Sequence, residues 1–209
     1  MDPHGLPVAP ETTGTASPRE LRQHRRGSAG ALPEALRRPL VAAGASVVPV
    51  LIALVEDALA DDHADWGWAP LYAVDLLGAL GDARVVPVLL RCLDQEDACG
   101  LLVQQAAEAL CALGALALDS CLRAYATTPR DAFRDRLAGV MSQWGLHDER
   151  LYTVLLDTLQ RTPELGANDL AEYGDARALD VLAQTFDALP LREGDNPLAN
   201  HVFIRHYRF

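Results

Sequence analysis

Residues 76–93, LLGALGDARVVPVLLRCL, decide the fold class of this chain. Leu77 and Leu80 stand four and one positions before Gly81, which would place them on one face of a helix. Glycine commonly ends a helix, because it adopts a positive φ without steric cost. Asp82 is well placed to cap a second helix by accepting a backbone N–H at its start. The stretch therefore predicts one helix, a tight turn and the start of another helix.

This arrangement occurs five times along the chain. Each time, an apolar residue stands four positions before a glycine and another stands one position before it, and the glycines are Gly44, Gly81, Gly114, Gly145 and Gly174. They are separated by 37, 33, 31 and 29 residues, a period that suits one helical hairpin per repeat. Because one hairpin cannot bury its own apolar face, neighbouring hairpins must stack. The sequence therefore predicts an all-α protein, an α-solenoid of about five helical hairpins.

The segments around the glycines also have helical spacing. Before Gly114, the apolar residues at positions 102, 106, 109, 110 and 113 would form one stripe on a helix. After the glycines, second helices are expected over residues 85–93, 116–125, 151–159 and 178–189. Thr128-Pro129 and Thr162-Pro163 each predict an N-cap followed by proline at the first helical position, and hence the start of the next unit.

The two ends of the chain differ in composition. The solenoid is expected over residues 31–209, whereas residues 1–30 are polar, rich in proline and glycine, and predict a flexible leader. The basic group at residues 19–26 is interpreted as a solvated tail, with a tether for an acidic partner as the alternative. Residues 197–209 predict a last half-repeat that caps the stack. Docking of this half-repeat on another chain, or a longer natural sequence, are the alternatives.

The charge of the chain favours a protein partner. The formal net charge is −11, and an acidic surface repels the phosphate backbones that nucleic-acid-binding proteins contact with basic patches. No apolar stretch reaches the roughly 18 residues that a membrane span needs, and the N-terminal residues lack the apolar region of a signal peptide. We therefore expect a cytoplasmic protein that binds another, more basic protein, and neither nucleic acid nor membrane.

No motif in the sequence predicts catalysis or a cofactor. The four cysteines, Cys92, Cys99, Cys111 and Cys121, form no C-x-x-C pair, so they are interpreted as buried free thiols and not as zinc ligands. The sequence contains no G-x-S-x-G motif, P-loop or dinucleotide-binding fingerprint. The chain is therefore expected not to be an enzyme, and no catalytic residue, metal or cofactor is assigned.

The densest polar feature is an acidic stretch, residues 56–65, followed by Trp66 and Trp68. Oxygen ligands at such spacing could hold a calcium ion, but the pattern of an EF-hand loop is missing. A solvated loop between repeats is therefore the simpler interpretation. Tryptophan is enriched at the energetic centres of protein interfaces. The two tryptophans are thus candidate partner-binding residues, with packing on the first repeat as the alternative.

Two segments resemble a known repeat. Residues 80–89, LGDARVVPVL, and residues 173–182, YGDARALDVL, are similar to the bacterial HEAT-like repeat named after phycocyanobilin lyases. The resemblance covers roughly residues 33–189 and is weaker in the third and fourth repeats, where Gly114 and Gly145 are not followed by aspartate. It implies a right-handed α-α superhelix of the armadillo-like kind, used mostly as a scaffold, with the second helices on the concave side.

We expect a non-enzymatic adaptor or scaffold that holds another protein on this concave face. Its binding surface should come from polar positions of the second helices, which are Arg84, Arg91, Arg123, Asp157, Gln160, Arg177, Asp180, Gln184 and Asp187, together with Trp66 and Trp68. Arg84 and Arg177 follow the G-D-A motif equivalently, so a role in stacking the repeats is their alternative. Two other functions stay open: a chromophore-lyase-like enzyme or cofactor chaperone, suggested only by the family name, and an interaction domain of a larger assembly.

Overall fold

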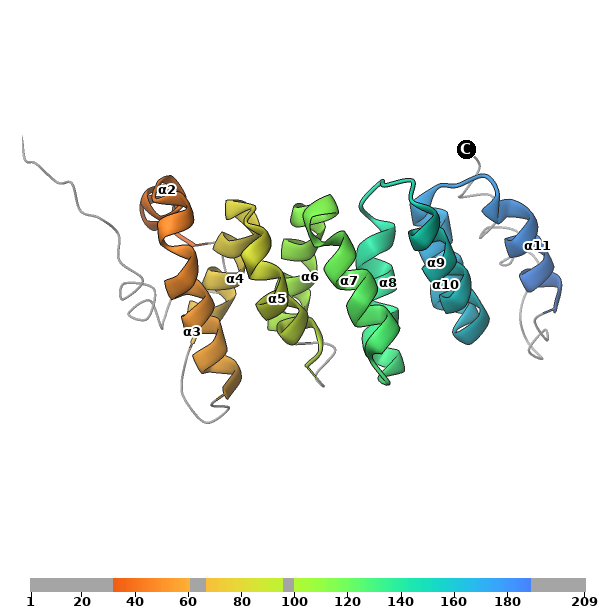
Figure 1. The fold of residues 1–209 in the computed structure, drawn as a ribbon, viewed down its shortest axis with the longest axis horizontal. Coiled ribbons are helices and arrows are strands. Elements are labelled where there is room, and N and C mark those ends of the chain that lie inside the picture. The colour runs from red at the N-terminus through yellow and green to blue at the C-terminus, as the bar shows by residue number, and fades with distance from the viewer. Residues whose placement is uncertain (1–31, 61–66, 96–99, 189–209) are drawn as a thin grey trace, which may run out of the picture.

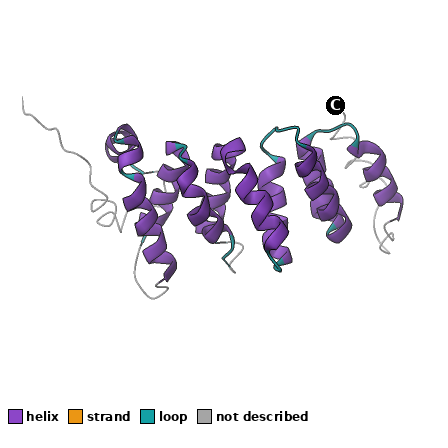
Figure 2. Ribbon diagram, viewed as in Figure 1, coloured by secondary structure: helices purple, strands orange, loops and turns teal. Residues whose placement is uncertain are grey.

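The computed structural model describes residues 32–60, 67–95 and 100–188. Within these ranges every regular element is a helix (Figure 1 and Figure 2), which confirms the predicted all-α class. The predicted leader at residues 1–30, the loop with Trp66 and the predicted half-repeat at residues 197–209 lie outside the described residues.

The helices alternate between two layers (Figure 1). The first layer holds the helix that precedes each repeat glycine, and its members are α2 (Glu34–Ala42), α4 (Ala69–Leu80), α6 (Leu101–Leu113), α8 (Asp131–Ser142) and α10 (Pro163–Tyr173). The second layer holds the helix that follows each glycine, and its members are α3 (Val48–Ala60), α5 (Val86–Leu93), α7 (Leu118–Thr127), α9 (Glu149–Arg161) and α11 (Ala178–Ala188).

The main contacts between helices connect neighbours in this arrangement. In the first layer, α2, α4, α6 and α8 each contact the next helix of that layer, and in the second layer α3 contacts α5 and α5 contacts α7. Each second helix up to α9 also packs against the first helix of the following unit, as α5 does against α6. The buried apolar residues form one core that is shared along this row of helix pairs, as a repeat array requires.

The five repeat glycines mark the crossings from the first layer to the second. Their φ angles are all positive, at 59°, 63°, 51°, 61° and 74° from Gly44 to Gly174. A side chain disfavours this region whereas glycine does not, so the chain can turn at these positions into the second layer (Figure 1). Four of the first-layer helices end within two residues of their glycine, whereas α8 already ends at Ser142, three residues before Gly145. The predicted glycine turns are therefore confirmed.

Several helix starts differ from the predicted ones. A short 3-10 turn precedes the second helix in three units, at η1 (Gly44–Ser46), η2 (Ala83–Val85) and η3 (Gly114–Ala117). Thr128-Pro129 does not start α8, as predicted. That helix begins at Asp131, and Thr128 Oγ1 instead accepts a hydrogen bond from the backbone N–H of Arg130 at 3.2 Å. Thr162-Pro163 does start α10, although the Thr162 side chain makes no capping hydrogen bond.

Two glycines inside helices allow close packing. A Cβ added at Gly78 of α4 would lie 2.9 Å from the Cα and Cβ of Ala109 in α6. A Cβ at Gly166 of α10 would lie only 2.3 Å from the N and Cα of Leu159 in α9. Both distances are shorter than a Cβ tolerates, so these helix–helix contacts depend on glycine.

One helical run, Leu101–Thr127, is long and apolar enough to cross a membrane by length and composition. This differs from the expectation that no such stretch exists. The run contains α6, η3 and α7, and it passes from the first layer to the second at Gly114 (Figure 1). Leu110 and Cys121 of this run are fully buried in the shared core, whereas Leu101 and Leu116 are more than half exposed, and a third of the apolar window is buried.

The three described cysteines are free, and the prediction of buried free thiols is confirmed for Cys92 and Cys121, whereas Cys111 is half-buried. Cys92 and Cys121 are buried, and burial raises the pKa of both thiols to about 12. Cys111 is half-buried, and its Sγ lies 3.8 Å from the backbone oxygen of Val140 in α8. A thiol that stays protonated is a poor nucleophile and a poor metal ligand, so these side chains act as small apolar groups. Cys99 lies outside the described residues.

Candidate functional site

The residues predicted to line a binding surface lie on or beside the second-layer helices. Their order along the array is Arg84 in η2, Arg91 in α5, Arg123 in α7, Asp157 and Gln160 in α9, Arg177 before α11, and Asp180, Gln184 and Asp187 in α11. The residues in α11 are four and three positions apart, so they share one face of that helix. The structure separates this set into side chains held by other protein groups and side chains that are free.

Three arginines near the starts of second helices are held by the aspartate two residues earlier. The pairs are Asp82–Arg84, Asp148–Arg150 and Asp175–Arg177. In each pair the carboxylate accepts the arginine's backbone N–H at 2.8–2.9 Å and also accepts hydrogen bonds from its guanidinium. The arginine hydrogen bonds lower the pKa of Asp82 and Asp175 to about 2. Each aspartate therefore fixes the turn and orients the arginine.

Two of these arginines also connect successive units. Arg150 donates to Asp119 of α7 at 2.9 Å. Arg177 pairs with Glu149 of α9 at 2.9 Å, and its guanidinium carbon lies 4.5 Å from the centre of the Tyr152 ring. A guanidinium over an aromatic face adds attraction to the ion pair. These contacts run from the start of one second helix to the start of the previous one.

The contacts favour repeat stacking, the alternative stated for both arginines, as the role of Arg177. The contacts shown for Arg84 are with Asp82 in its own turn and connect no two units. Sequence reasoning missed the third pair, Asp148–Arg150, because Gly145 is not directly followed by aspartate. The shared signal is an Asp-x-Arg triplet, which recurs in all three turns even though its distance from the glycine varies. A search for that triplet would have found it.

Arg91 and Arg123 have weaker partners. Arg91 Nη1 lies 3.0 Å from Glu56 Oε1 in α3, and both side chains are about half exposed. Among the described residues, the side-chain partner of Arg123 is the hydroxyl of Ser120, which lies 3.4 Å from Nη2. Exposed ion pairs contribute little to stability because water screens them. Both guanidinium groups therefore remain open to another molecule.

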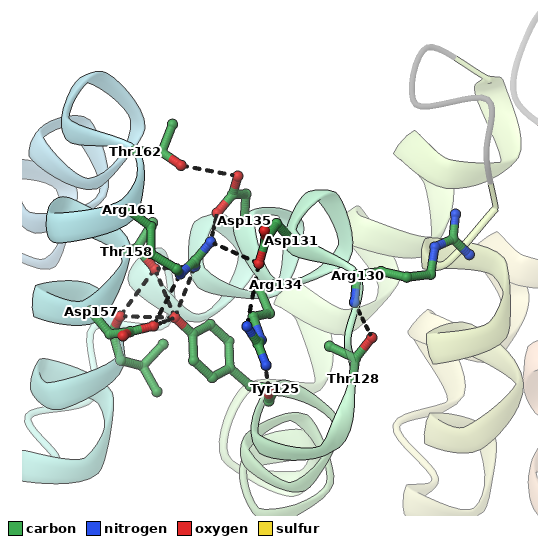
Figure 3. Close-up of polar contacts among 11 residues, drawn as sticks. Tyr125, Thr128, Arg130, Asp131, Arg134, Asp135, Asp157, Thr158, Arg161 and Thr162 are labelled. Carbon is green, nitrogen blue, oxygen red and sulfur yellow. Dashed lines mark hydrogen bonds and ion pairs between the residues drawn. The ribbon is translucent and has the colours of Figure 1, made fainter.

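A buried tyrosine connects three helices at the end of α7 (Figure 3). Tyr125 is 8% exposed, and its hydroxyl donates to Asp157 Oδ2 at 2.6 Å. Arg161 Nη2 donates to the same hydroxyl at 3.0 Å. Arg161 Nη1 also pairs with Asp135 Oδ1 of α8 at 2.9 Å, and Asp135 Oδ2 lies 3.3 Å from Thr162 Oγ1. The network ties α7, α8 and α9 together.

Asp157 therefore has a structural contact that sequence reasoning did not foresee. Burial raises the pKa of the Tyr125 hydroxyl, and the hydrogen bond from Tyr125 lowers the pKa of Asp157. At neutral pH the phenol is protonated and the carboxylate is charged, which is the pair that a short hydrogen bond requires. The two residues are far apart in the sequence, so no local pattern reveals their contact.

An open, mainly apolar cleft lies between α9 and α11. Its volume is about 400 Å³, and its walls are Leu156, Leu159, Gln160, Pro163, Val181, Gln184 and Thr185. The cleft brings together two of the predicted site residues, Gln160 and Gln184. Neither glutamine side chain has a hydrogen-bond partner within the described part of the chain. The cleft thus offers apolar surface together with two free amide groups.

Two carboxylates accompany this cleft. Asp180 and Asp187 are exposed and share a helix face with Gln184. Across residues 32–60, 67–95 and 100–188, neither carboxylate takes part in an ion pair. In this respect they differ from Asp157 and from the capping aspartates, whose charges are compensated. The predicted residues on α11 therefore supply uncompensated negative charge next to apolar surface.

Trp68 lies elsewhere, just before α4 in the first layer. It is half-buried, packs against the core, and borders a groove of about 520 Å³ between α2, α4 and α6. Within that groove Asp75 pairs with Arg37 at 3.5 Å. Trp68 is therefore not part of the cleft between α9 and α11.

A further residue that sequence reasoning missed is Asp169 in α10. The position five residues before the repeat glycine holds Leu76, Ala109 and Val140 in the three preceding units, all of them buried. Asp169 occupies the same position and is 7% exposed. Burial, with a contribution from the nearby charge of Asp135, raises its pKa to about 7. The repeat register would have revealed this residue as a carboxyl group at a core position.

The comparisons with known proteins concern one helix pair. Residues 70–95 match the family model described as the PBS lyase HEAT-like repeat. The match spans α4, the turn at Gly81 and α5, and it supports the resemblance that the G-D-A turns predict. A search of curated proteins found no match to the chain. The chain thus contains a HEAT-like repeat within an all-helical structure.

Proposed function

We propose that this helical repeat protein is a non-enzymatic adaptor that holds another protein on its second layer. In this proposal about five hairpins form a right-handed α-α superhelix, and the second helices line its concave face. The layered packing and the HEAT-like helix pair at residues 70–95 support this arrangement. We expect the adaptor to act in the cytoplasm.

The cleft between α9 and α11 is the observation that carries the proposal. It combines apolar walls with the amides of Gln160 and Gln184 and the carboxylates of Asp180 and Asp187, which have no hydrogen-bond or ion-pair partner in the described part of the chain. Interfaces gain most of their affinity from a few buried anchors, whereas flanking charges set the association rate and the choice of partner. The cleft can accept an apolar anchor side chain of the partner. The two aspartates attract basic residues of the partner that flank this anchor.

The partner that fits is a basic protein segment with an apolar anchor. The net charge of −11 attracts cationic proteins over a distance of several ångströms, and salt weakens this attraction. Arg84 and Arg177 are excluded from the proposed surface because their guanidinium groups are held within the fold. The proposed contact residues are therefore Asp180, Gln184 and Asp187 with Gln160.

Affinity capture with three baits tests the proposal. The baits are the wild-type chain, the double variant Asp180→Arg/Asp187→Arg, and a control with the same change in net charge, Glu34→Arg/Glu108→Arg, on exposed first-layer positions. A basic partner should be captured by the wild type and the control and lost with the α11 variant. With the purified partner, the α11 variant should lower affinity at least about tenfold, and more at low salt.

Two outcomes would contradict the adaptor proposal. Equal capture by all three baits would show that the charge next to the cleft does not select the partner. A visible absorption change on adding a linear tetrapyrrole, with no protein captured, would favour the lyase-like or cofactor-chaperone alternative. Asp157 is left unchanged in these baits, because its bonds to Tyr125 and Arg161 are part of the fold.

A further inference from the structure

The apolar face of α11 is less covered than the same face of other second helices. In α5, the residues 4, 7 and 11 positions after the capping residue Asp82 are Val86, Leu89 and Leu93. These three side chains are at most 1% exposed. The equivalent residues in α11 are Leu179, Leu182 and Phe186. Leu179 is 51% exposed, and the other two are half-buried. The apolar residues thus occupy equivalent positions in α5 and α11, but those of α11 are more exposed to solvent.

The structure shows what covers this face in the preceding unit. In α9 the seventh and eleventh residues after Asp148 are Leu155 and Leu159, at 0% and 2% exposure. Gly166 of α10 approaches the backbone of Leu159 so closely that a Cβ would lie 2.3 Å from it. The first helix of the following unit therefore covers this face of a second helix.

The first layer shows which position of α10 a following helix would contact. Three residues before the repeat glycine, Gly78 of α4 meets α6 and Cys111 of α6 meets α8. The equivalent residue of α8, Ser142, is 2% exposed. In α10 this position is Ala171, which is only half-buried. Cys111 is also half-buried although it meets α8, so burial at this position does not distinguish α10 from the earlier units, and the open end is seen at α11.

The chain continues with a segment that has the sequence of such a helix. Residues 189–196 separate α11 from Pro197, as many residues as the 61–68 connection between α3 and α4. Asn196-Pro197 places a capping residue before proline, as Thr162-Pro163 does at the start of α10. Leu198 and Val202 are then spaced for one helix face.

The charge of this segment is complementary to the charge of α10. Residues 197–209 contain Arg205 and Arg208 but no acidic residue. The neighbouring helix α10 presents exposed Glu164 and Glu172. Because the segment is covalently attached through a short connection, its effective concentration at α11 is far above that of a second copy in solution.

We propose that residues 197–209 pack across α10 and α11 as the first helix of a further unit and cover Leu179, Leu182 and Phe186. The segment closes the apolar end of the array and prevents another copy from stacking there. The cleft is formed by α11 with the preceding helices α9 and α10, whereas the proposed contact is with the segment that follows α11. The inference is independent of the proposed adaptor function.

Hydrogen exchange of the full chain, read by mass spectrometry, tests the contact. In the double variant Val202→Asp/Phe203→Asp, the amides of α11 should exchange at least about tenfold faster, whereas those of α5 should not change. Leu191→Asp places the same kind of substitution in the connection and is the matched control, with no expected change. The amides of α5 also report whether the rest of the array remains folded.

The reverse substitution completes the test. Leu182→Asp in α11 should accelerate exchange in residues 197–209 by a similar factor. The proposal is overturned if α11 exchanges equally fast in the wild type and the Val202→Asp/Phe203→Asp variant. It is also overturned if the protection of α11 rises with protein concentration, because a second copy would then provide the cover.

Discussion

The helices α5 and α11 begin in the same way and are buried differently. Both follow a glycine with positive φ and an Asp-Ala-Arg triplet in which the aspartate accepts the arginine's backbone N–H at 2.9 Å. Yet Val86 of α5 is 1% exposed and its equivalent in α11, Leu179, is 51% exposed. Local sequence therefore fixes the turn, whereas the neighbouring helices decide how much of the apolar face is buried. Substitutions in the turns and in the packed helix faces can test these two contributions separately.

Removing a core side chain from α5 should have the largest effect. Leu89 is completely buried between α5 and its neighbours, and truncating a buried leucine costs about 2–5 kcal/mol because it leaves a cavity. We expect Leu89→Ala to lower the free energy of unfolding by this amount in urea titrations. If residues 197–209 cover α11, Leu182→Ala should cost nearly as much. A cost of less than about 1 kcal/mol for Leu182→Ala would mean that α11 is exposed in solution.

The close contact between α10 and the end of α9 can be disrupted by a substitution in α10. Gly166→Ala introduces a Cβ that would lie 2.3 Å from the backbone of Leu159, so one helix must move. Overpacking of this kind costs about 1–3 kcal/mol. The matched substitution Gly78→Ala, where the distance is 2.9 Å, should cost less. Thermal unfolding of the two variants gives the comparison, and an equal loss would argue against the tight approach of α10 to α9.

The carboxyl group of Asp169 should make stability depend on pH. Its pKa is raised to about 7 in the folded chain against 3.8 for an unperturbed aspartate, so the folded state binds more protons between these values. The free energy of unfolding should therefore fall by about 1–3 kcal/mol as the pH rises from 4 to 7, and change little above 7.

The variant Asp169→Asn isolates this contribution because it removes the charge and keeps the shape. It should be more stable than the wild type at pH 8 and about equally stable at pH 4. The nearby Asp135 pairs with Arg161 and is unchanged in this variant. Urea titrations at several pH values provide the measurement, and the same pH dependence in both proteins would refute the assignment to Asp169.

The smallest effect is expected at the two turns themselves. Asp82→Ala and Asp175→Ala each remove a half-buried capping carboxylate and its contact with an exposed arginine. The two losses should be small and nearly equal, because the turns have the same local geometry. Both aspartates have a pKa of about 2, so their contribution is present above about pH 4 and is lost as the pH falls toward 2. Unequal losses at pH 7 would show that the turns depend on their surroundings.

Much of the fold could be predicted because its signals are local. The glycine turns, the helical spacing before them and the Asp82 and Asp175 caps each depend on a few consecutive residues. The start of α8 was predicted wrongly at Thr128-Pro129, because a Thr-Pro pair is also compatible with a turn before the helix. The unit containing Asp148–Arg150 was judged degenerate because the triplet is displaced from its glycine.

The candidate site could be predicted only as a set of polar positions. Sequence spacing placed Asp157, Gln160 and Gln184 on second helices, where the structure has them. It could not separate Asp157, which Tyr125 and Arg161 hold in place, from Asp180, which has no ion-pair partner among the described residues. The pair Asp157–Arg161 is four positions apart and is compatible with local helical spacing, but the contact with Tyr125 joins residues 32 positions apart, and such a contact leaves no periodic trace in the sequence.

The sequence by itself determined that the chain is helical, where most helices turn, and which faces are apolar, because backbone conformation and side-chain spacing are properties of neighbouring residues. Only the tertiary structure decided which charges are compensated and that a cleft opens between α9 and α11. These features depend on the distance between helices from different units. That distance is set by packing, including the close approach of Gly166 to Leu159, and packing is a property of the whole array.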